Sequence, residues 1–468
     1  MIALDSLRQK FPPQGFFAEK EWLLSPEPFP LDATTAEEIR SLGYRLLLFY
    51  RACNRLYERS VKGTLPSWIA AYCDAGKPAG LLQQARAPAL RQALPRIIRP
   101  DLLLTERGLV AAELDSVPGG IGLTAWLNQT YGRNGGGDVL GGATGMLEGF
   151  TSILPGGADI LISEEAAGYR PEMEWLTARL NEQTPTNGGR SYRVVDAEDY
   201  VPLTDRDAYR FFELFDLANL PSASALLDAA AAGRQLLTPP PKPWLEEKLW
   251  MALFWARPLR DVWRRELSDN QFRRLSALFP QSWVVDPTPL PHHAVIPGLD
   301  VHNWMEIAQF TQKKRELVLK LSGFHDHAWG ARSVTVGHDV SHRDWEAALE
   351  HAIASFPAHP YVLQEFHRSK IVEHPYFDRE TGAIQTMRGR VRLCPYYFVS
   401  QQDDRVTLGG VLATICPEDK KILHGMKDAI MAPCRESGES FHPSTLESRK
   451  SETSATRSGD APQPPSHP

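Results

Sequence analysis

The stretch RPDLLLTERGLVAAELDSVPGG, residues 99–120, contains two apolar runs on either side of a Glu-Arg-Gly turn. This pattern is typical of a β-hairpin. Residues two apart on a strand project from the same face of a sheet, so Arg99 is expected beside Asp101, and Glu113 beside Asp115. With the turn centred on the arginine between the runs, Asp101 faces Glu113 and Arg99 faces Asp115 across the hairpin.

Three carboxylates and one guanidinium thus converge on one face of the predicted hairpin. Like charges that face each other across a sheet repel, so we expect the carboxylates to need an outside cation. Mg²⁺ suits them because it takes oxygen ligands and is often shared with substrate phosphates, and an arginine beside it suits a phosphate oxygen. From spacing alone, a solvated hairpin face with one Arg–Asp pair remains an open alternative.

The same segment resembles the terminal metal-binding strand pair of the ATP-grasp ligases, which reads Arg-x-Asp, an apolar run, Gly, and then Glu-x-Asn-x-x-Pro-Gly. The resemblance implies that Arg99 contacts nucleotide phosphates and that Asp101, Glu113 and Asp115 hold two Mg²⁺ ions. Asp115 stands where the family usually has Asn, which changes the charge of the site more than its geometry. The following SVPGGIG, residues 116–122, would be a loop near the acceptor substrate.

A second candidate region is ELVLKLSGFHDHAWGARSV, residues 316–334. Lys320 ends an apolar strand, and the loop after it contains Ser322, Gly323 and Gly330. Such a loop can bring backbone N–H groups and a lysine charge to a phosphate. It lacks the Gly-Lys-Ser/Thr of a Walker A loop, and an ordinary strand end with a flexible turn remains open. Beside the hairpin, it resembles the lysine and glycine-rich flap of ATP-grasp enzymes.

Two further segments resemble the nucleotide half of the same family. YVLQEF, residues 361–366, resembles its hinge strand, which would place Gln364, Glu365 and Phe366 along the adenine. WLEEKLWMALFW resembles the helix that bears its first nucleotide lysine, here Lys248. Taken without the resemblance, Lys248 is read as an exposed helix residue.

GRVRLCPYYFV, residues 389–399, predicts a central strand with Arg390 and Arg392 on one face. That face is either an exposed basic surface or a contact for phosphate or substrate. We assign Arg392 to the catalytic set with Arg99 and Lys320.

The triplet His325-Asp326-His327 invites a metal-site reading because histidine is a common zinc ligand. No third ligand motif follows it at a recognisable spacing. We therefore expect a structural role, or a role at the surface of the loop.

The order of the segments favours one group within the ATP-grasp family. In ordinary ATP-grasp proteins the carboxylate hairpin comes last, whereas here it lies near residue 100, before both lysines. This is the order of the circularly permuted ATP-grasp group, which includes glutathionylspermidine synthase-like proteins. ILISEEAAGYRPEMEWLTARL, residues 160–180, also resembles the small α/β lobe of that group. The likeness covers roughly residues 40–434.

The fold class expected is α/β, or α+β, with a circularly permuted ATP-grasp fold. Apolar residues recur at helical spacing over residues 34–60, where Thr35 and Glu38 read as a capping box, and a strand–helix–strand pattern after residue 157 predicts a parallel sheet. The expected parts are a helical N-terminal region (1–95), the metal-carboxylate hairpin packing into the ATP-grasp core (96–131), a Gly-rich linker (132–157), a small α/β lobe (158–243), the nucleotide-binding region (244–434) and a disordered tail (435–468).

Composition excludes several classes of protein. The 468 residues carry a net charge of −6 and contain no basic stripe, so nucleic acid is not an expected partner. No run approaches the roughly 20 apolar residues of a membrane helix. The five cysteines are scattered without a CxxC pair, which argues against a disulfide scaffold or a structural zinc site and favours a reducing cytoplasm.

Together the resemblance implies an ATP- and Mg²⁺-dependent ligase that joins a small-molecule carboxylate to an amine through an acylphosphate. Two alternatives stay open: an ATP-grasp kinase for a small molecule, and a non-catalytic nucleotide-binding or scaffold protein. The identity of the acid and the amine, and the oligomeric state, are not legible in the sequence.

Overall fold

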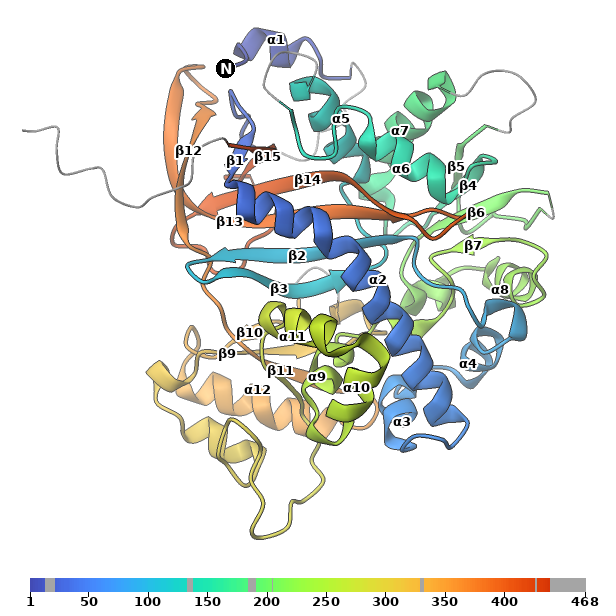
Figure 1. Cartoon of the computed structure of the whole chain (residues 1–468), viewed down its shortest axis with the longest axis vertical. Coiled ribbons are helices and arrows are strands. Elements are labelled where there is room, and N and C mark those ends of the chain that lie inside the picture. Colours follow the sequence, from blue (N-terminus) through green and yellow to red (C-terminus); the bar gives the residue numbers. More distant parts are fainter. Residues whose placement is uncertain are drawn as a thin grey trace, which may run out of the picture.

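The computed structural model of the chain describes residues 1–12, 22–132, 138–183, 191–203, 205–328, 332–425 and 427–437. Within these residues the strands form three sheets, and helices surround them (Figure 1). The chain is therefore a mixed α/β protein, which agrees with the class expected from its strand and helix patterns.

The largest sheet joins the predicted hairpin to strands from the last part of the chain. From one edge to the other its strands are β1 (Phe29–Leu31), β15 (Ile430–Glu436), β14 (Val406–Pro417), β13 (Ile384–Val399), β2 (Ile97–Thr105) and β3 (Gly108–Asp115), and β12 (Ile371–Phe377) also pairs with β13. β13 runs antiparallel to β2, with Arg392 opposite Leu103. Residues near 100 thus share a sheet with residues near 390.

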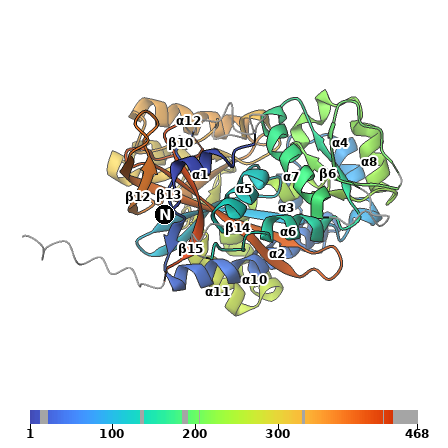
Figure 2. The same cartoon turned by 90° about the horizontal axis from the view of Figure 1, so that it is seen from above.

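The two smaller sheets differ in the direction of their strands. One is antiparallel and consists of β10 (Thr335–Val336), β9 (Leu317–Leu321), β11 (Tyr361–Glu365) and β8 (Ser282–Val284). The other is parallel and consists of β5 (Arg193–Asp196), β4 (Ala158–Ile162), β6 (Asp207–Phe211) and β7 (Leu237–Thr238), as the strand–helix–strand pattern predicts. Figure 2 shows the parallel sheet at one side of the largest sheet.

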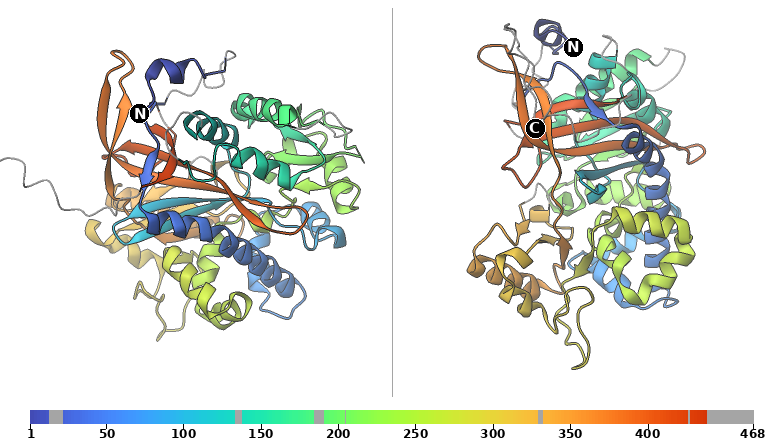
Figure 3. Two further views of the ribbon diagram at one scale, coloured as in Figure 1. Left: turned by 45° about the horizontal axis from the view of Figure 1, so that its top comes forward. Right: turned by 60° about the vertical axis from the view of Figure 1, so that its left-hand side comes forward.

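The α-helices of the described residues cover the sheets. They are α1 (Leu4–Arg8), α2 (Ala33–Val61), α3 (Trp68–Asp74), α4 (Ala79–Ala85), α5 (Ile121–Gly132), α6 (Gly145–Ile153), α7 (Arg170–Gln183), α8 (Ala223–Ala231), α9 (Leu249–Trp255), α10 (Arg260–Leu267), α11 (Asp269–Leu278) and α12 (His342–Ser355). Below the largest sheet lie helices α9–α11 and the unit of β9, β11 and α12 (Figure 3, right-hand view), and α9 packs against β11 through Leu249, Ala252 and Val362.

The largest sheet has a hydrophobic core on each face. Helix α2 packs on one face against Leu393 and Tyr397 of β13, whereas α5 and α6 pack on the other against Tyr396 and Phe398. Alternate residues of a strand point to opposite faces, and an irregularity between Tyr396 and Tyr397 shifts the register there. Helix α2 is long because its apolar residues keep helical spacing.

The start of α2 differs from the expected capping box. Asp32, rather than Thr35, is the N-cap, and its Oδ1 accepts a hydrogen bond from the backbone N–H of Thr35 at 2.8 Å.

The Gly-rich segment 132–157 was expected to be a linker, but it contains helix α6. Its glycines permit close packing: a Cβ on Gly141 would lie 2.2 Å from the carbonyl oxygen of Gly409 in β14, and one on Gly149 would lie 2.2 Å from the ring of Phe398. The glycines therefore permit close contact with the largest sheet.

Two expectations from composition agree with the structure. No helix in the described ranges has the length and apolar character needed to cross a membrane. All five cysteines are buried and free. The chain continues β15 to Glu436, two residues into the predicted tail, and residues 438–468 lie outside the described residues.

Candidate active site

The hairpin of β2 and β3 pairs its charged residues as the sequence predicts, although from Leu102 to Thr105 the register differs by one residue from that of a turn centred on Arg107. Arg99 lies opposite Asp115, and Asp101 lies opposite Glu113. All four side chains line one cavity of about 840 Å³.

Two arginines hold the two aspartates of the hairpin. Arg99 Nε lies 3.1 Å from Asp101 Oδ1, and Arg99 Nη2 lies 2.9 Å from Asp115 Oδ2. Arg392 on β13 reaches the other oxygen of Asp101, with Nη1 2.8 Å from Oδ2. Asp101 therefore bridges two guanidinium groups from neighbouring strands.

The third carboxylate, Glu113, pairs with a lysine from a distant segment. Lys248 Nζ lies 2.9 Å from Glu113 Oε1 and donates to the carbonyl oxygen of Ala328 at 3.0 Å. Lys248 is the residue before α9 and its side chain is only 17% exposed, so the reading as an exposed helix residue is wrong. In the structure, Arg99, Arg392 and Lys248 supply three positive charges to the three carboxylates.

Burial and ion pairing shift the pKa values of the hairpin carboxylates in opposite directions. Burial raises the pKa of Asp101, but Arg392 and Arg99 outweigh it and hold the pKa below its ordinary value. The pKa of Asp115 is raised, because burial and the nearby Glu113 outweigh the attraction of Arg99. Asp101 therefore loses its proton at a lower pH than Asp115 does.

Lys320 enters the same cavity from β9 of the second sheet. Its side chain is buried and donates to the carbonyl oxygen of Ala112 at 3.0 Å and to Gln364 Oε1 at 2.9 Å. Ala112 has no partner in β2, because it is the extra residue of a β-bulge, which takes its carbonyl group out of the ladder. Burial lowers the pKa of Lys320.

The loop after β9 carries the predicted phosphate-binding residues. Ser322 Oγ donates to the Glu247 carboxylate and accepts from the backbone N–H of Leu249 at 2.9 Å, so it fastens the loop to the start of α9. Gly323 lines the cavity, and a Cβ there would lie 2.9 Å from the Glu247 carboxylate, so a close approach requires glycine. Gly330 lies outside the described residues.

The predicted hinge residues all border the cavity but differ in what they offer it. Gln364 is buried, and its amide is used within the protein: Oε1 accepts from Lys320, and Nε2 donates to Ser282 Oγ at 3.2 Å. Glu365 and Phe366 present a carboxylate and an aromatic ring.

The two arginines of β13 have different surroundings. Arg392 lines the cavity, and its Nε has no hydrogen-bond partner among the described residues. Arg390 instead donates to the carbonyl oxygens of Glu418, at 2.9 Å, and Ser369. Of this pair, only Arg392 is positioned to contact a molecule in the cavity.

Glu213 and Glu246 also line the cavity, although neither of them was assigned a role from the sequence. Glu213 follows β6, and Glu246 lies shortly before α9. Glu246 pairs with the buried Arg210, whereas the side chain of Glu213 accepts no hydrogen bond and forms no ion pair with any described residue. Burial and the neighbouring Glu246 raise the pKa of Glu213 to about 8. Glu213 reaches the cavity from the end of β6, and Glu246 from the turn before α9.

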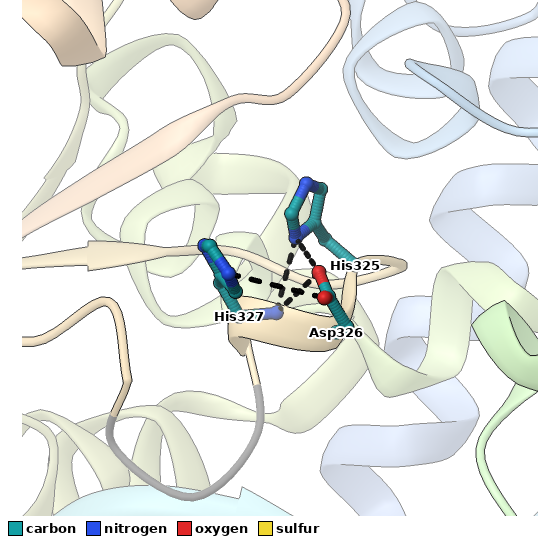
Figure 4. Close-up of side chains that lie close together, drawn as sticks. All are labelled: His325, Asp326 and His327. Carbon is teal, nitrogen blue, oxygen red and sulfur yellow. Dashed lines mark hydrogen bonds and ion pairs between the residues drawn. The ribbon is translucent and has the colours of Figure 1, made fainter.

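A second cluster of chemically active side chains lies in the loop after Gly323. His325, Asp326 and His327 point toward one another (Figure 4). None of the three lines the main cavity, and each is at least partly exposed.

Comparisons with known proteins give likeness in fold alone. No protein-family model matches the chain, and no curated protein matches it. A glutathione synthetase-like effector from Globodera pallida is similar over 92% of this chain and 95% of its own, with 12% identity and a TM-score of 0.49. A protein assigned as a gamma-glutamylcysteine synthetase from Methylobacillus flagellatus is similar over 85% of this chain and 87% of its own, with 12% identity and a TM-score of 0.39.

Proposed function

We propose that the chain is an ATP- and Mg²⁺-dependent ligase that forms an amide from a carboxylate and an amine, with an ATP-grasp nucleotide site in circularly permuted order. One observation carries the proposal. Three carboxylates and four cations from distant parts of the chain line a single cavity: Arg99, Asp101, Glu113, Asp115, Lys248, Lys320 and Arg392.

These side chains fit a polyphosphate and Mg²⁺ through an exchange of partners. Each carboxylate is held by Arg99, Arg392 or Lys248. An entering polyphosphate offers the same cations new oxygen partners, which leaves the carboxylate oxygens free for Mg²⁺, an ion that takes such ligands. Within this set three negative and three positive charges balance, and Lys320 adds one positive charge.

The proposed role of the cations is to position and stabilise the transferring phosphoryl group. Bound Mg²⁺ would neutralise phosphate charge there. Lys248, at the start of α9, and Lys320, in β9, are far along the chain from the hairpin that carries Arg99. Phe366 and Val318, which also line the cavity, offer the apolar surface that an adenine ring requires.

The reaction has two steps. A carboxylate oxygen of the acid attacks the γ-phosphorus of ATP, and the bond to the β-phosphate oxygen breaks, so an acylphosphate forms and ADP leaves. The amine nitrogen then attacks the acyl carbon and loses a proton, and inorganic phosphate leaves as the amide forms.

The proposal is tested by incubating the purified chain with ATP, Mg²⁺ and pools of amino acids, small peptides and polyamines. We expect ADP, inorganic phosphate and a new amide, identified by mass spectrometry, only when ATP and Mg²⁺ are both present. A phosphorylated pool member with no amide would replace the ligase by a kinase. If calorimetry showed no binding of ATP at millimolar concentration, both the ligase and the kinase would be overturned.

A further inference from the structure

We propose that His325, Asp326 and His327 bind a transition-metal ion of the Zn²⁺, Co²⁺ or Ni²⁺ class, at a site separate from the main cavity. Each of the three residues offers one ligand atom, and these atoms all lie within 4.8 Å of one another. Figure 4 shows the carboxylate of Asp326 and the two imidazole rings at the corners of a triangle.

The distances within the cluster fit one shared ion after small side-chain movements. Asp326 Oδ1 lies 2.6 Å from His325 Nδ1, and Asp326 Oδ2 lies 3.8 Å from His327 Nε2. The two ring centres are 5.1 Å apart. With Zn–N bonds of about 2.0–2.1 Å and ring centres about 1.1 Å beyond the nitrogen, two imidazoles on one ion have centres about 4.5–5.3 Å apart.

The donor set selects the class of metal. Two imidazole nitrogens and one carboxylate suit zinc, cobalt and nickel, whereas Mg²⁺ prefers oxygen ligands alone. The hairpin, with its three carboxylates, is the all-oxygen counterpart within the same molecule. The chain thus separates a nitrogen-rich cluster from an oxygen-rich one.

Other polar side chains lie near the cluster, outside its three ligand residues. His359 packs edge-on against His325, with ring centres 4.9 Å apart. Glu165 and Asp216, from the part of the chain that carries the parallel sheet, border the same surface hollow as His325 and Asp326. The nearby cations already have anionic partners, because Lys77 pairs with the buried Glu247 and Arg332 lies 3.6 Å from Glu165.

A bound ion would restrict the loop that borders the main cavity. The residue after His327 is Ala328, whose carbonyl oxygen accepts the hydrogen bond from Lys248. Fixing His325 and His327 on one ion therefore fixes the chain beside that contact. The metal site does not itself depend on the proposed ligase activity.

The test is titration of the purified, metal-free chain with Co²⁺, followed by its visible absorption, and with Zn²⁺, followed by calorimetry, both without nucleotide. The variant is H325A/H327A, and the matched control is H292A/H293A, which removes a second, exposed pair of histidines. Circular dichroism verifies that both variants stay folded.

We expect one ion per chain, at least about tenfold weaker binding in H325A/H327A, and unchanged binding in H292A/H293A. Absence of binding by the native chain at about 100 μM metal would overturn the proposal. Equal binding by native chain and H325A/H327A, or an equal loss in both variants, would overturn it as well. The assay involves no ATP, so its failure leaves the proposed ligase untouched.

Discussion

The charges of the main cavity are held in two different ways on its two sides. On the hairpin side, Asp101 is shared by Arg99 and Arg392, so each buried charge has an opposite charge within hydrogen-bond distance. On the side built by β9 and the end of β6, Lys320 has only neutral partners and Glu213 has none among the described residues.

This difference separates the charged groups that stabilise the fold from those that a bound ligand would stabilise. Removing one partner of a buried ion pair leaves an uncompensated charge, so the hairpin charges stabilise one another. A buried lysine with neutral acceptors gains far less from its surroundings, and its lowered pKa reflects that cost. Lys320 is therefore the cation that a bound phosphate would stabilise most.

The largest effect is expected from Asp101→Asn. The amide cannot neutralise Arg99 and Arg392, so the free energy of unfolding should fall by about 3 kcal/mol and turnover should be lost. Urea denaturation monitored by circular dichroism measures the first effect. The double variant D101N/R392M should recover part of the stability, because it removes one of the two arginine charges that D101N leaves without this carboxylate.

The control for this substitution is Asp199→Asn in an exposed loop, which should unfold like the native chain. A loss of less than about 1 kcal/mol in D101N would mean that its ion pairs are solvated, as at a protein surface. The contrast between the two sides of the cavity would then disappear.

The next effect is expected from Glu113→Gln. The Glu113 side chain is 39% exposed in its pair with Lys248, so water replaces part of the lost interaction and stability should fall by less than in D101N. Turnover should nevertheless fall at least about 100-fold, because one charged ligand of the proposed Mg²⁺ site is lost. ADP release with increasing Mg²⁺ measures it.

Glu106→Gln, on the exposed turn of the same hairpin, is the matched control and should behave like the native chain. Unchanged ADP release by E113Q at low Mg²⁺ would refute the role of this carboxylate as a metal ligand.

The hairpin was the most predictable part of the site. The turn is one residue shorter than expected, with Thr105 opposite Gly108, and a bulge restores the pairing of Asp101 with Glu113. Strand alternation is local, so the hairpin itself and the face that its charged residues share followed from the sequence. The bulge at Ala112 did not, because nothing in the apolar run GLVAA marks an extra residue. That bulge supplies the carbonyl group that holds Lys320.

The remaining cavity residues depend on packing between distant segments. Lys248 has no local feature that separates it from an exposed helix lysine, and only the family resemblance suggested a nucleotide role. Glu213 carries no motif at all, because its neighbours come from other strands and loops. The glycines of residues 132–157 led to a wrong prediction of a linker, because Gly149 instead permits close contact with Phe398.

A smaller effect, and a sharper test of the comparison, is expected from Lys320→Met. The thioether side chain retains much of the apolar volume and removes a buried charge that has only neutral partners, so stability should stay the same or rise slightly. Affinity for ATP with Mg²⁺ should fall roughly 10- to 100-fold, the effect of one charge-assisted hydrogen bond. Calorimetry measures the affinity.

The exposed Lys313→Met is the control on the same part of the chain. If K320M were destabilised as strongly as D101N while binding ATP normally, Lys320 would be a structural cation and the two sides of the cavity would not differ.

The last effect depends on pH and concerns Glu213, whose side chain has no hydrogen bond or ion pair among the described residues. Its pKa of about 8 in the folded chain, against an ordinary value of 4.5, means that the folded state holds a proton that the unfolded state releases. Stability should therefore fall as the pH rises from about 4.5 to about 8. Glu246 and Asp115 repel the ionised group, whereas Arg210 and Lys248 attract it.

Glu213→Gln carries no titrating proton, so it should be close to the native chain in stability near pH 5 and exceed it near pH 8.5, by at most about 4 kcal/mol. Urea denaturation at the two pH values gives the difference, with the exposed Glu380→Gln as the control that should track the native chain at both. An equal offset at both pH values would show that Glu213 is ionised throughout, and thus that a charge without a partner is tolerated on this side of the cavity as readily as a paired one is on the other.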